Sequence, residues 1–215
     1  LLKAKGYDLE IVEFTDYVTP NIAVNEGELD ANFFQHLPYL EEFNKNKNTD
    51  LVKTVNVHLE PMGLYSNKIK ALSELEDGAT IAVPNDPTNE SRALDILVKE
   101  GLLTFKDVDF KTVVDIIENP KNLKIKELDA PQLPRVLDEV DAAIINTNYA
   151  LSANLNPLKD AIIIESKDSP YANIIVVKKG NENKDSIKAL NEVINSAEIK
   201  TFIKEKYQGS IVEAF

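Results

Sequence analysis

Short apolar runs that alternate with helical patterns constrain the fold of this chain more than any other feature. Several runs are continuous rather than alternating in polarity, which is typical of parallel strands covered on both faces. Strands that alternate with helices predict an α/β architecture. The expected strands are Leu9–Phe14, Val52–Leu59, Thr80–Val83, Leu123–Leu128, Ala142–Ile145, Ala161–Glu165 and Asn173–Val177, and the expected helices are Phe34–Lys45, Glu90–Glu100, Pro131–Glu139, Lys184–Asn195 and Ala197–Tyr207.

The composition excludes several classes of function. The 215 residues include 24 Lys and Arg against 36 Asp and Glu. The resulting charge of −12 argues against nucleic acid as a partner, because phosphate binding needs clustered cations. The chain has no cysteine, which excludes disulfides, thiol nucleophiles and thiolate metal sites. No apolar run approaches the ~20 residues that a membrane-spanning helix needs.

The first residues, Leu1 to Gly6, read as the last turn of a helix that a glycine closes. They resemble neither a signal peptide nor a chain start with an initiator methionine. We therefore expect a further segment, now missing, to precede Leu1. The length allows one large domain or two lobes of about 100 residues each.

The stretch Val83–Arg92 is the first candidate ligand site. A strand ends there, a turn of Pro, Asn and Asp follows, and a helix opens behind a polar N-cap. Arg92 lies near the first turn, where the helix dipole disfavours a cation. An arginine at this place suits an anion such as a carboxylate, held by a bidentate contact. A surface ion pair of Arg92 with Glu90 or Asp95 explains the spacing equally well.

Three amides form the second candidate site. Asn146 and Asn148 directly follow a buried strand, and ligands of open α/β sheets bind beyond the carboxyl ends of strands. Both amides could bind a zwitterion, or one could form an Asx turn that caps the next helix. Asn173 lies inside the apolar run Tyr171–Val177, where a polar side chain needs a partner from ligand or backbone.

The third candidate site gathers apolar rings and polar tips. It lies in the stretch Asp30–Leu40 and contains Phe33, Phe34, His36 and Tyr39. Such a group suits an apolar ligand moiety with oriented contacts, and Tyr17, which follows another expected strand, could join it. Core packing is the alternative, and we favour it for Phe33.

Metal and catalytic motifs are absent from the sequence. His36 and His58 are the only histidines, and they lack the H-x-x-x-H spacing typical of a zinc site. There is no G-x-S-x-G elbow, no Walker A sequence and no G-x-G-x-x-G. We expect no cofactor, no metal ligands and no enzyme activity.

Seven motifs resemble the NlpA/MetQ family of methionine-binding lipoproteins, which serve bacterial ABC importers. They occur in the same order and span nearly the whole chain. The motifs are Phe14–Asn21, Asp30–Leu40, Glu60–Ser66, Ala82–Thr88, Glu118–Leu123, Ala130–Arg135 and Ser169–Asn173.

The resemblance implies a periplasmic-binding-protein fold of type II, with a ligand cleft between two α/β lobes. Lobe 1 would comprise residues 1–60 and 182–215, and lobe 2 would comprise residues 61–181. The crossings would fall near His58–Pro61 and Lys178–Asn181. The family has a strand and a helix ahead of the position of Leu1, preceded by a signal peptide and a lipidated cysteine. We expect lobe 1 to lack that strand and helix.

The resemblance also implies the ligand and its contacts. Arg92 would bind the carboxylate of methionine, and Asn173 would hold its polar end with Asn148, or with Asn146 in its place. The residues implied for the thioether pocket are Tyr17, His36, Tyr39 and His58, with Tyr65 as a further candidate.

The implied function is delivery of methionine to the permease and ATPase of an ABC importer. The protein would work in the cell envelope, in the periplasm or on the outer face of the cytoplasmic membrane, attached only by a lipid anchor. The alternatives are a methionine-containing dipeptide, another amino acid or, less favoured, a metal ion as ligand, and an enzyme on the same fold.

Overall fold

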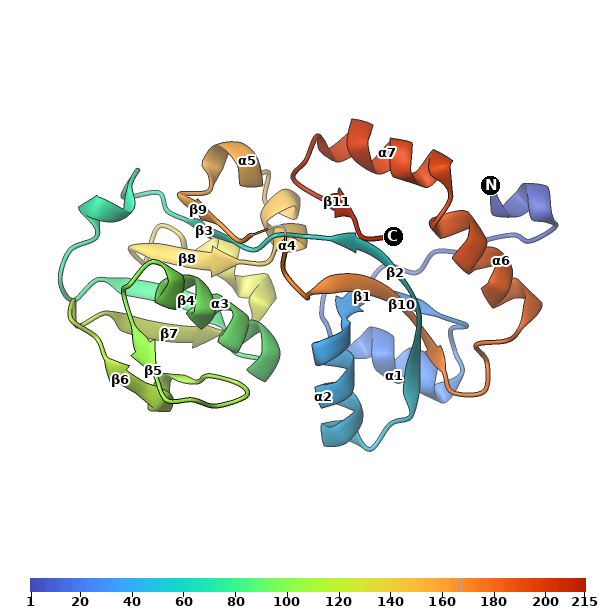
Figure 1. Cartoon of the computed structure of the whole chain (residues 1–215), viewed down its shortest axis with the longest axis horizontal. Helices are drawn as coiled ribbons and strands as arrows, with labels where there is room; N and C mark the ends of the chain where they lie inside the picture. Colours follow the sequence, from blue (N-terminus) through green and yellow to red (C-terminus); the bar gives the residue numbers. More distant parts are fainter. Residues whose placement is uncertain (167) are drawn as a thin grey trace. The chain divides into compact units, whose positions relative to one another are not determined.

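The chain divides into two compact units in its computed structural model, which describes residues 1–166 and 168–215 (Figure 1). Unit 1 comprises Leu1–Glu60 and Lys167–Phe215, and unit 2 comprises Pro61–Ser166. Each unit has its own sheet with helices packed on it, which confirms the predicted α/β class.

Unit 1 contains an antiparallel sheet with the strand order β1-β10-β2-β11. Its buried core includes Val24, Leu40 and Val176. The strands are β1 (Asn32–His36), β10 (Ala172–Lys178), β2 (Leu51–Leu59) and β11 (Val212–Glu213), and the helices are η1 (Leu2–Lys5), α1 (Thr19–Glu26), α2 (Leu37–Lys47), α6 (Asp185–Ile194) and α7 (Ala197–Tyr207).

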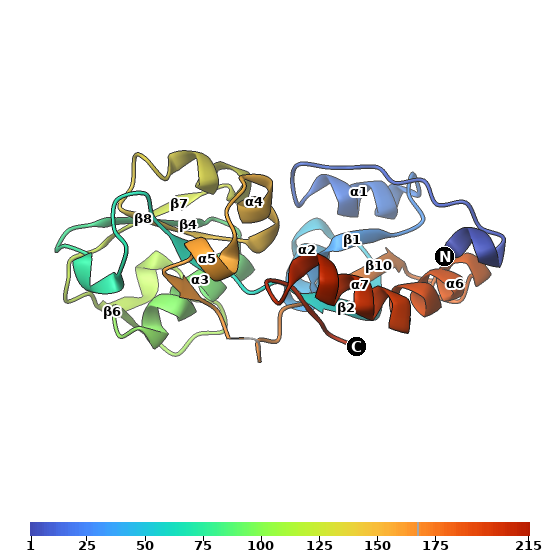
Figure 2. The same ribbon diagram turned by 90° about the horizontal axis from the view of Figure 1, so that it is seen from above.

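The start of the chain forms the expected helical turn. The 3₁₀ helix η1 ends at Gly6, whose φ of 85° is the left-handed conformation that glycine adopts at a helix end. Figure 2 shows η1 beside α6, and Lys5 forms an ion pair of 2.7 Å with Glu192 of that helix. This local prediction is confirmed.

The strand predicted at Leu9–Phe14 is wrong. Residues 7–14, all of which the structure describes, form no strand. Leu9 and Ile11 expose 59% and 74% of their surface. Apolar residues favour a strand only where a neighbouring strand supplies hydrogen bonds and a covered face, and this segment has neither in its described surroundings.

The region predicted as one helix, Phe34–Lys45, begins as strand β1 and becomes helix α2 at Leu37. The switch has a local cause. Nδ1 of His36 accepts a hydrogen bond of 3.2 Å from the Tyr39 amide, and Pro38 occupies the first turn, where its missing N–H costs nothing. His36 is therefore the N-cap of α2.

Unit 2 contains a mixed sheet with the strand order β7-β4-β8-β3-β9. β4 runs parallel to β7 and β8, whereas β3 runs antiparallel to β8 and β9. β8 is fully buried and β4 is buried after its first residue, Thr80, as their continuous apolar runs predicted. The strands are β3 (Gly63–Tyr65), β4 (Thr80–Pro84), β7 (Lys124–Leu128), β8 (Ala142–Ile145) and β9 (Ile163–Ile164), and a separate two-stranded ribbon pairs β5 (Thr104–Phe105) with β6 (Ile116–Glu118).

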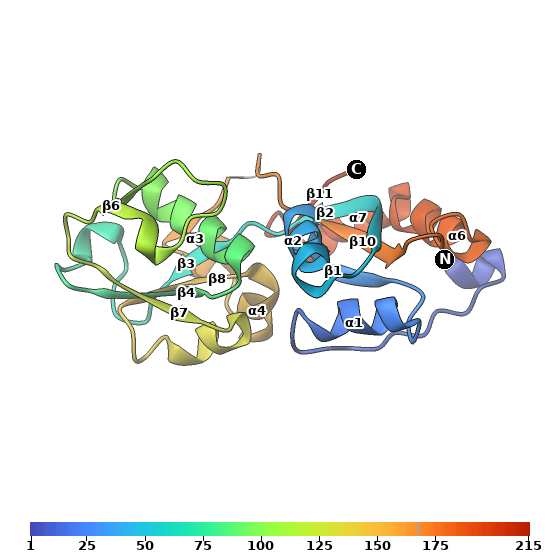
Figure 3. The ribbon, with the colours of Figure 1, turned by 90° about the horizontal axis from the view of Figure 1, so that it is seen from below.

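Helices cover both faces of the unit 2 sheet, with α3 on one face and η4 on the other (Figure 3). The helix predicted at Pro131–Glu139 is the 3₁₀ helix η4, and Pro134 inside it removes a hydrogen-bond donor that an α-helix would need. The helices are η2 (Leu72–Glu74), α3 (Pro87–Lys99), η3 (Val113–Asp115), η4 (Ala130–Val136), α4 (Thr147–Ser152) and α5 (Pro157–Asp160).

The second division between the units differs from the expected one. It falls directly after Ser166, whereas the sequence placed it near Lys178–Asn181. The cause is β10, which pairs with β2 along its whole length and with β1 over Asn173–Val176. Since β10 lies between two strands of the unit 1 sheet, it folds with unit 1. The first division lies between Glu60 and Pro61.

Within the described residues, no helix combines the length and the apolar composition that a membrane span requires.

Candidate functional site

The first turns of α3 place the charged and polar side chains of unit 2. Asp86 is the N-cap of this helix, and its carboxylate accepts a hydrogen bond of 3.0 Å from the Asn89 amide. Pro87 occupies the first turn. Asn89 and Arg92 stand three positions apart and therefore lie on the same helix face. Both side chains are buried.

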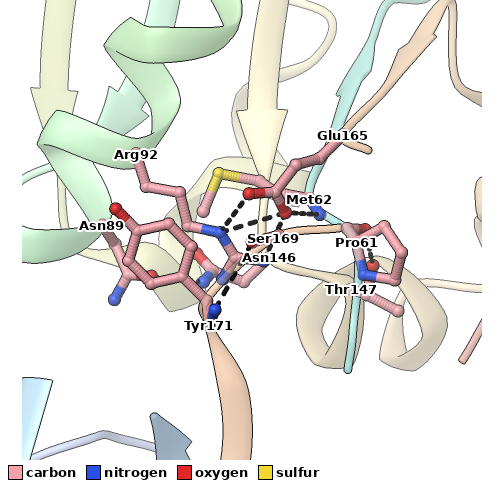
Figure 4. Close-up of polar contacts among 9 residues, drawn as sticks. All are labelled: Pro61, Met62, Asn89, Arg92, Asn146, Thr147, Glu165, Ser169 and Tyr171. Atoms are coloured by element: carbon pink, nitrogen blue, oxygen red, sulfur yellow. Dashed lines mark hydrogen bonds and ion pairs between the residues drawn. The ribbon is translucent and has the colours of Figure 1, made fainter. Parts of the chain in front are cut away.

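Arg92 forms an ion pair with Glu165, a residue 73 positions away in the sequence (Figure 4). Nε of Arg92 donates to both carboxylate oxygens of Glu165, at 3.0 and 3.1 Å, and Nη2 donates to Oε2. The side chains are 4% and 6% exposed. Glu90 and Asp95, the partners that the sequence suggested, do not make this contact, and Asp95 pairs with Lys111 instead.

Glu165 was missed as a candidate residue. The signal was present, because Glu165 ends the apolar run Ala161–Glu165 that we expected to be a buried strand. A carboxylate in such a place needs a cation or several donors. The sequence alone does not say which cation supplies the contact.

A chain of amides leads from the start of α3 to Asn146. Nδ2 of Asn89 donates to both oxygens of Asp86 at 3.0 Å, which turns the oxygen of the Asn89 amide the other way. That oxygen accepts a hydrogen bond of 2.9 Å from Nδ2 of Asn146. The orientation of the Asn146 amide is thus determined by its neighbours.

Oδ1 of Asn146 is a buried acceptor with no hydrogen-bond partner among the residues that the structure describes. Asn146 is 8% exposed. It occupies the N-cap position of α4, but its side chain does not cap the helix, so the Asx-turn interpretation does not hold for it. Asn148 is half-buried in the first turn of α4. Of the two alternatives, Asn146 carries the unsatisfied acceptor.

Burial shifts the pKa of two carboxyl groups at this end of α3. Burial raises the pKa of Asp86, and the hydrogen bonds from Asn89 and Thr88 oppose that shift only in part. Burial, together with the nearby charge of Glu127, raises the pKa of Glu90 to about 7. The Val113 amide donates to Glu90 at 3.3 Å and partly opposes this shift.

Three predicted site residues of unit 1 lie in one row across its sheet. His36 of β1 is opposite Asn173 of β10, and Asn173 is opposite His58 of β2. Directly opposed residues of antiparallel strands project from the same face. His36 and Asn173 are buried, and Nε2 of His58 lies 2.7 Å from Oε1 of Glu60.

The predicted aromatic residues of unit 1 lie together. The Tyr39 hydroxyl donates to the Tyr17 carbonyl at 2.8 Å, and the two rings meet edge-on at 6.1 Å. The His36 ring lies 4.9 Å from the ring of Tyr171, which the sequence analysis did not select. Phe33, for which we favoured core packing, is 41% exposed and meets the His58 ring edge-on at 5.0 Å.

Tyr65 is a core residue of unit 2. It is 1% exposed, and its hydroxyl has no hydrogen-bond partner within the described part of the chain. Burial raises its pKa. Its ring lies so close to Gly63 that a Cβ there would come within 2.9 Å of it.

The histidines do not form a metal site in the part of the chain that the structure describes. No group of three or more His, Cys, Asp or Glu side chains there could hold a metal ion. The asparagine of β10 separates His36 from His58 in the sheet.

Comparisons with known proteins identify close relatives. The chain is 47% identical over 210 residues to outer membrane lipoprotein 3 of Mannheimia haemolytica, covering 97% of this chain and 80% of that protein. It is 46% identical over 214 residues to the D-methionine-binding lipoprotein MetQ of Escherichia coli K12, covering 98% of this chain and 79% of that protein.

The fold of the chain also matches that of a solved structure. A nutrient-binding protein from Burkholderia cenocepacia bound to methionine superposes with a TM-score of 0.96 at 50% identity, covering 98% of this chain and 90% of that one. The likeness supports the two-lobed fold of substrate-binding proteins that the motifs implied. The family model of the NlpA lipoproteins matches residues 1–215, and the chain therefore belongs to the NlpA lipoprotein family.

Proposed function

We propose that this chain is a substrate-binding protein that captures methionine for an ABC importer. Two relatives support this function. The Burkholderia cenocepacia protein, 50% identical, was solved with methionine, and the Escherichia coli relative is named a D-methionine-binding lipoprotein. The chemistry of the two units supports the same ligand, because each unit offers groups that suit one part of it.

Arg92 is the proposed partner of the ligand carboxylate. A guanidinium presents five N–H donors in a plane, and two of its edges match a carboxylate. The Nε edge is occupied by Glu165. The ligand would use the edge formed by Nη1 and Nη2.

Asn146 is the proposed partner of the ligand ammonium group, and its unsatisfied Oδ1 is the observation that carries the site assignment. A buried acceptor without a donor costs roughly 1–3 kcal/mol. An ammonium group supplies donors and a charge, so binding would remove that cost. Asn89 accepts a hydrogen bond from Nδ2 of Asn146, which leaves Oδ1 of Asn146 to accept one from the ligand.

Unit 1 offers groups that suit the thioether. A sulfur atom interacts favourably with ring edges, and the rings of Tyr17, His36 and Tyr39 lie together in this unit. His58 and Asn173 continue the row from His36 across the sheet. We propose that these side chains contact the methionine, with Asn173 holding a polar group.

Membership in a lipoprotein family indicates a place in the cell envelope. We propose that a lipid anchor is the only attachment to the membrane, and that the permease and ATPase of the importer are the partners. The proposed role is transport rather than catalysis.

Calorimetric titration with L-methionine tests the proposal. We expect wild-type protein to bind L-methionine. Arg92→Ala should raise the Kd at least roughly tenfold, because it removes hydrogen bonds between charged groups, and Asn173→Ala should also bind more weakly. The matched control is Arg135→Ala, since Arg135 is the other of the two arginines and is exposed.

Further titrations separate the alternatives. D-methionine, a methionine-containing dipeptide and Zn²⁺ are titrated into the same wild-type preparation. Binding of the dipeptide or another amino acid in place of methionine would move the specificity within the same function. No heat with any methionine compound would contradict the proposed ligand, and tight binding by Arg92→Ala would remove the carboxylate assignment.

A further inference from the structure

Glu165 contacts the guanidinium of Arg92 and the backbone of Met62, the residue directly before β3, at the same time. Its Oε2 accepts from Nε and Nη2 of Arg92 and also from the Met62 amide, at 3.0 Å in the last case (Figure 4). Its Oε1 accepts from Nε of Arg92 at 3.0 Å. One carboxylate therefore joins helix α3 to the strand region that begins unit 2.

The backbone of Glu165 is fixed by the same neighbour. The Glu165 amide donates to the Met62 carbonyl at 2.8 Å, so the two residues exchange hydrogen bonds through side chain and main chain. β9, which directly precedes Glu165, pairs with β3, which directly follows Met62. Met62 itself is fully buried. Both the backbone and the carboxylate of Glu165 are thus hydrogen-bonded to Met62, beside the paired strands β3 and β9.

Stability alone is a poor explanation for this pair. Both side chains are almost completely buried. Removing two charges from water carries a desolvation cost that the attraction between them often only just offsets, so a buried ion pair is weak evidence for stability. What the pair does provide is orientation, because two parallel contacts hold a planar guanidinium in one plane and at one rotation.

That orientation matters for the ligand. Arg92 has four rotatable side-chain bonds, and ordering a long side chain at the moment of binding would cost conformational entropy. Glu165 takes the Nε edge, which directs the Nη1–Nη2 edge away from itself. A guanidinium held before binding presents this edge to a carboxylate without that cost.

We propose that Glu165 is a positioning residue for ligand recognition, which fixes the guanidinium of Arg92 in the orientation that receives the ligand carboxylate. The proposal rests on the proposed function of Arg92. It goes further in assigning to Glu165 an effect on affinity that acts through Arg92.

The two arginines of the chain make a direct test simple. Arginine Nε–H signals in a ¹⁵N–¹H spectrum arise only from Arg92 and Arg135. In ligand-free wild-type protein, we expect exchange of the Arg92 Nε–H with water to be at least about tenfold slower than that of exposed Arg135, because a hydrogen bond to a charged group must open first. Arg92→Lys, which removes one signal, assigns the spectrum.

Two substitutions then test the effect on binding. Glu165→Gln keeps the shape but removes the charge, and Glu165→Asp keeps the charge but shortens the reach. In folded protein, both should speed the exchange of the Arg92 Nε–H and raise the Kd for L-methionine at least about tenfold. Glu76→Gln, at an exposed carboxylate, should change neither quantity.

The outcomes separate this proposal from the proposed function. If wild-type protein binds methionine and both Glu165 variants bind it equally well, the positioning role is overturned. Equal exchange rates of the Arg92 and Arg135 Nε–H groups in wild-type protein would overturn it as well. This test needs no variant of Glu165, so it applies even if those variants do not fold. Failure of wild-type protein to bind methionine would instead contradict the proposed function, while the exchange rates would still test the fixed guanidinium.

Discussion

The polar side chains around the first turns of α3 differ in how many of their hydrogen-bonding groups have a partner in the protein. Asp86 receives hydrogen bonds from the Asn89 backbone and side chain, and Arg92 has the carboxylate of Glu165. Asn146 has a donor with a partner and an acceptor without one among the described residues. Native proteins leave few such groups, so each one calls for a physical reason. A ligand ammonium group is the reason proposed here.

Asn146→Ala should weaken methionine binding more than Asn148→Ala does. The first change removes the buried acceptor, while the second removes an amide that is half-buried in the next helix. We expect a loss of roughly tenfold or more for Asn146→Ala, from one hydrogen bond to a charged group. Calorimetry on both variants measures this difference, and an equal or larger loss in Asn148→Ala would move the assignment to Asn148.

Glu90→Gln should stabilise the protein above pH 7 and lose this advantage near pH 4. The pKa of Glu90 is raised to about 7 by burial and by Glu127, so the folded state holds a proton that the unfolded state releases near 4.5. Stability therefore falls as the pH rises from about 4.5 to about 7. Glutamine resembles the protonated acid and escapes this loss.

Thermal unfolding of Glu90→Gln at several pH values measures the effect, with Glu76→Gln as the control. Glu76 is exposed, and its substitution should give a difference that changes little with pH. A difference between wild-type protein and Glu90→Gln that does not grow between pH 4 and pH 8 would contradict the raised pKa of Glu90.

Polar and conformationally special residues at its two ends determine the bounds of helix α1. Helix α1 was not predicted, because its sequence has little apolar periodicity, and its start depends on Asp16. Oδ1 of that residue accepts hydrogen bonds of 2.7 Å from the amides of Val18 and Thr19. Pro20 then occupies the first turn, and Gly27 ends the helix with a φ of 84°.

Asp16→Ala should lower the free energy of unfolding by about 1 kcal/mol, because it removes the acceptor of the hydrogen bonds from the Val18 and Thr19 amides. Urea denaturation at neutral pH measures the change. Asp8→Ala is the matched control, because Asp8 is an exposed carboxylate in the preceding segment. A loss in Asp8→Ala as large as that in Asp16→Ala would show that general charge, rather than the hydrogen bonds of Asp16, is responsible.

The chain folds into two units. It passes from unit 1 to unit 2 between Glu60 and Pro61, and it returns to unit 1 after Ser166. Each unit is built around a sheet and has its own buried core. A ligand that binds only the folded chain stabilises it by mass action, in proportion to the logarithm of its concentration.

L-methionine should therefore raise the Tm of the wild-type protein, with about 2.7 kcal/mol of stabilisation at 100 times its Kd. Arg135→Ala should show the same increase, and at equal concentration the stabilisation of Arg92→Ala should be smaller by at least about 1.3 kcal/mol, the difference that a tenfold weaker Kd makes. Differential scanning calorimetry measures the three proteins together. An increase in Arg92→Ala equal to that of the wild type would separate Arg92 from ligand binding.

Local pattern was sufficient for much of the fold. The continuous apolar run at Ala142–Ile145 is strand β8, and the amphipathic pattern at Ala197–Tyr207 is helix α7. Both patterns extend over a few neighbouring residues and can therefore be read from the sequence, although β8 itself is paired with the distant strands β3 and β4. The prediction failed at Leu9–Phe14, where the local pattern is suitable for a strand but the structure shows no strand there.

Pairing between distant segments was not readable from local pattern. The run Asn173–Val177 indicates a buried strand, but its sequence does not say which sheet covers it, and the second division between the units was therefore misplaced. The same holds for Arg92. Its position in the helix predicted an anionic partner, but the partner that the structure shows comes from the end of β9.

The sequence by itself determined the α/β class, the family resemblance and the presence of Arg92, Asn146 and Asn173 near strand and helix ends. Helical and strand periodicity arise from contacts over a few residues, so the order of the amino acids contains them. Only the tertiary structure decided that Glu165 holds Arg92, that Asn146 keeps an unsatisfied acceptor, and that His36, Asn173 and His58 form one row. These relations depend on sheet register and on packing between residues far apart in the chain, which no local pattern specifies.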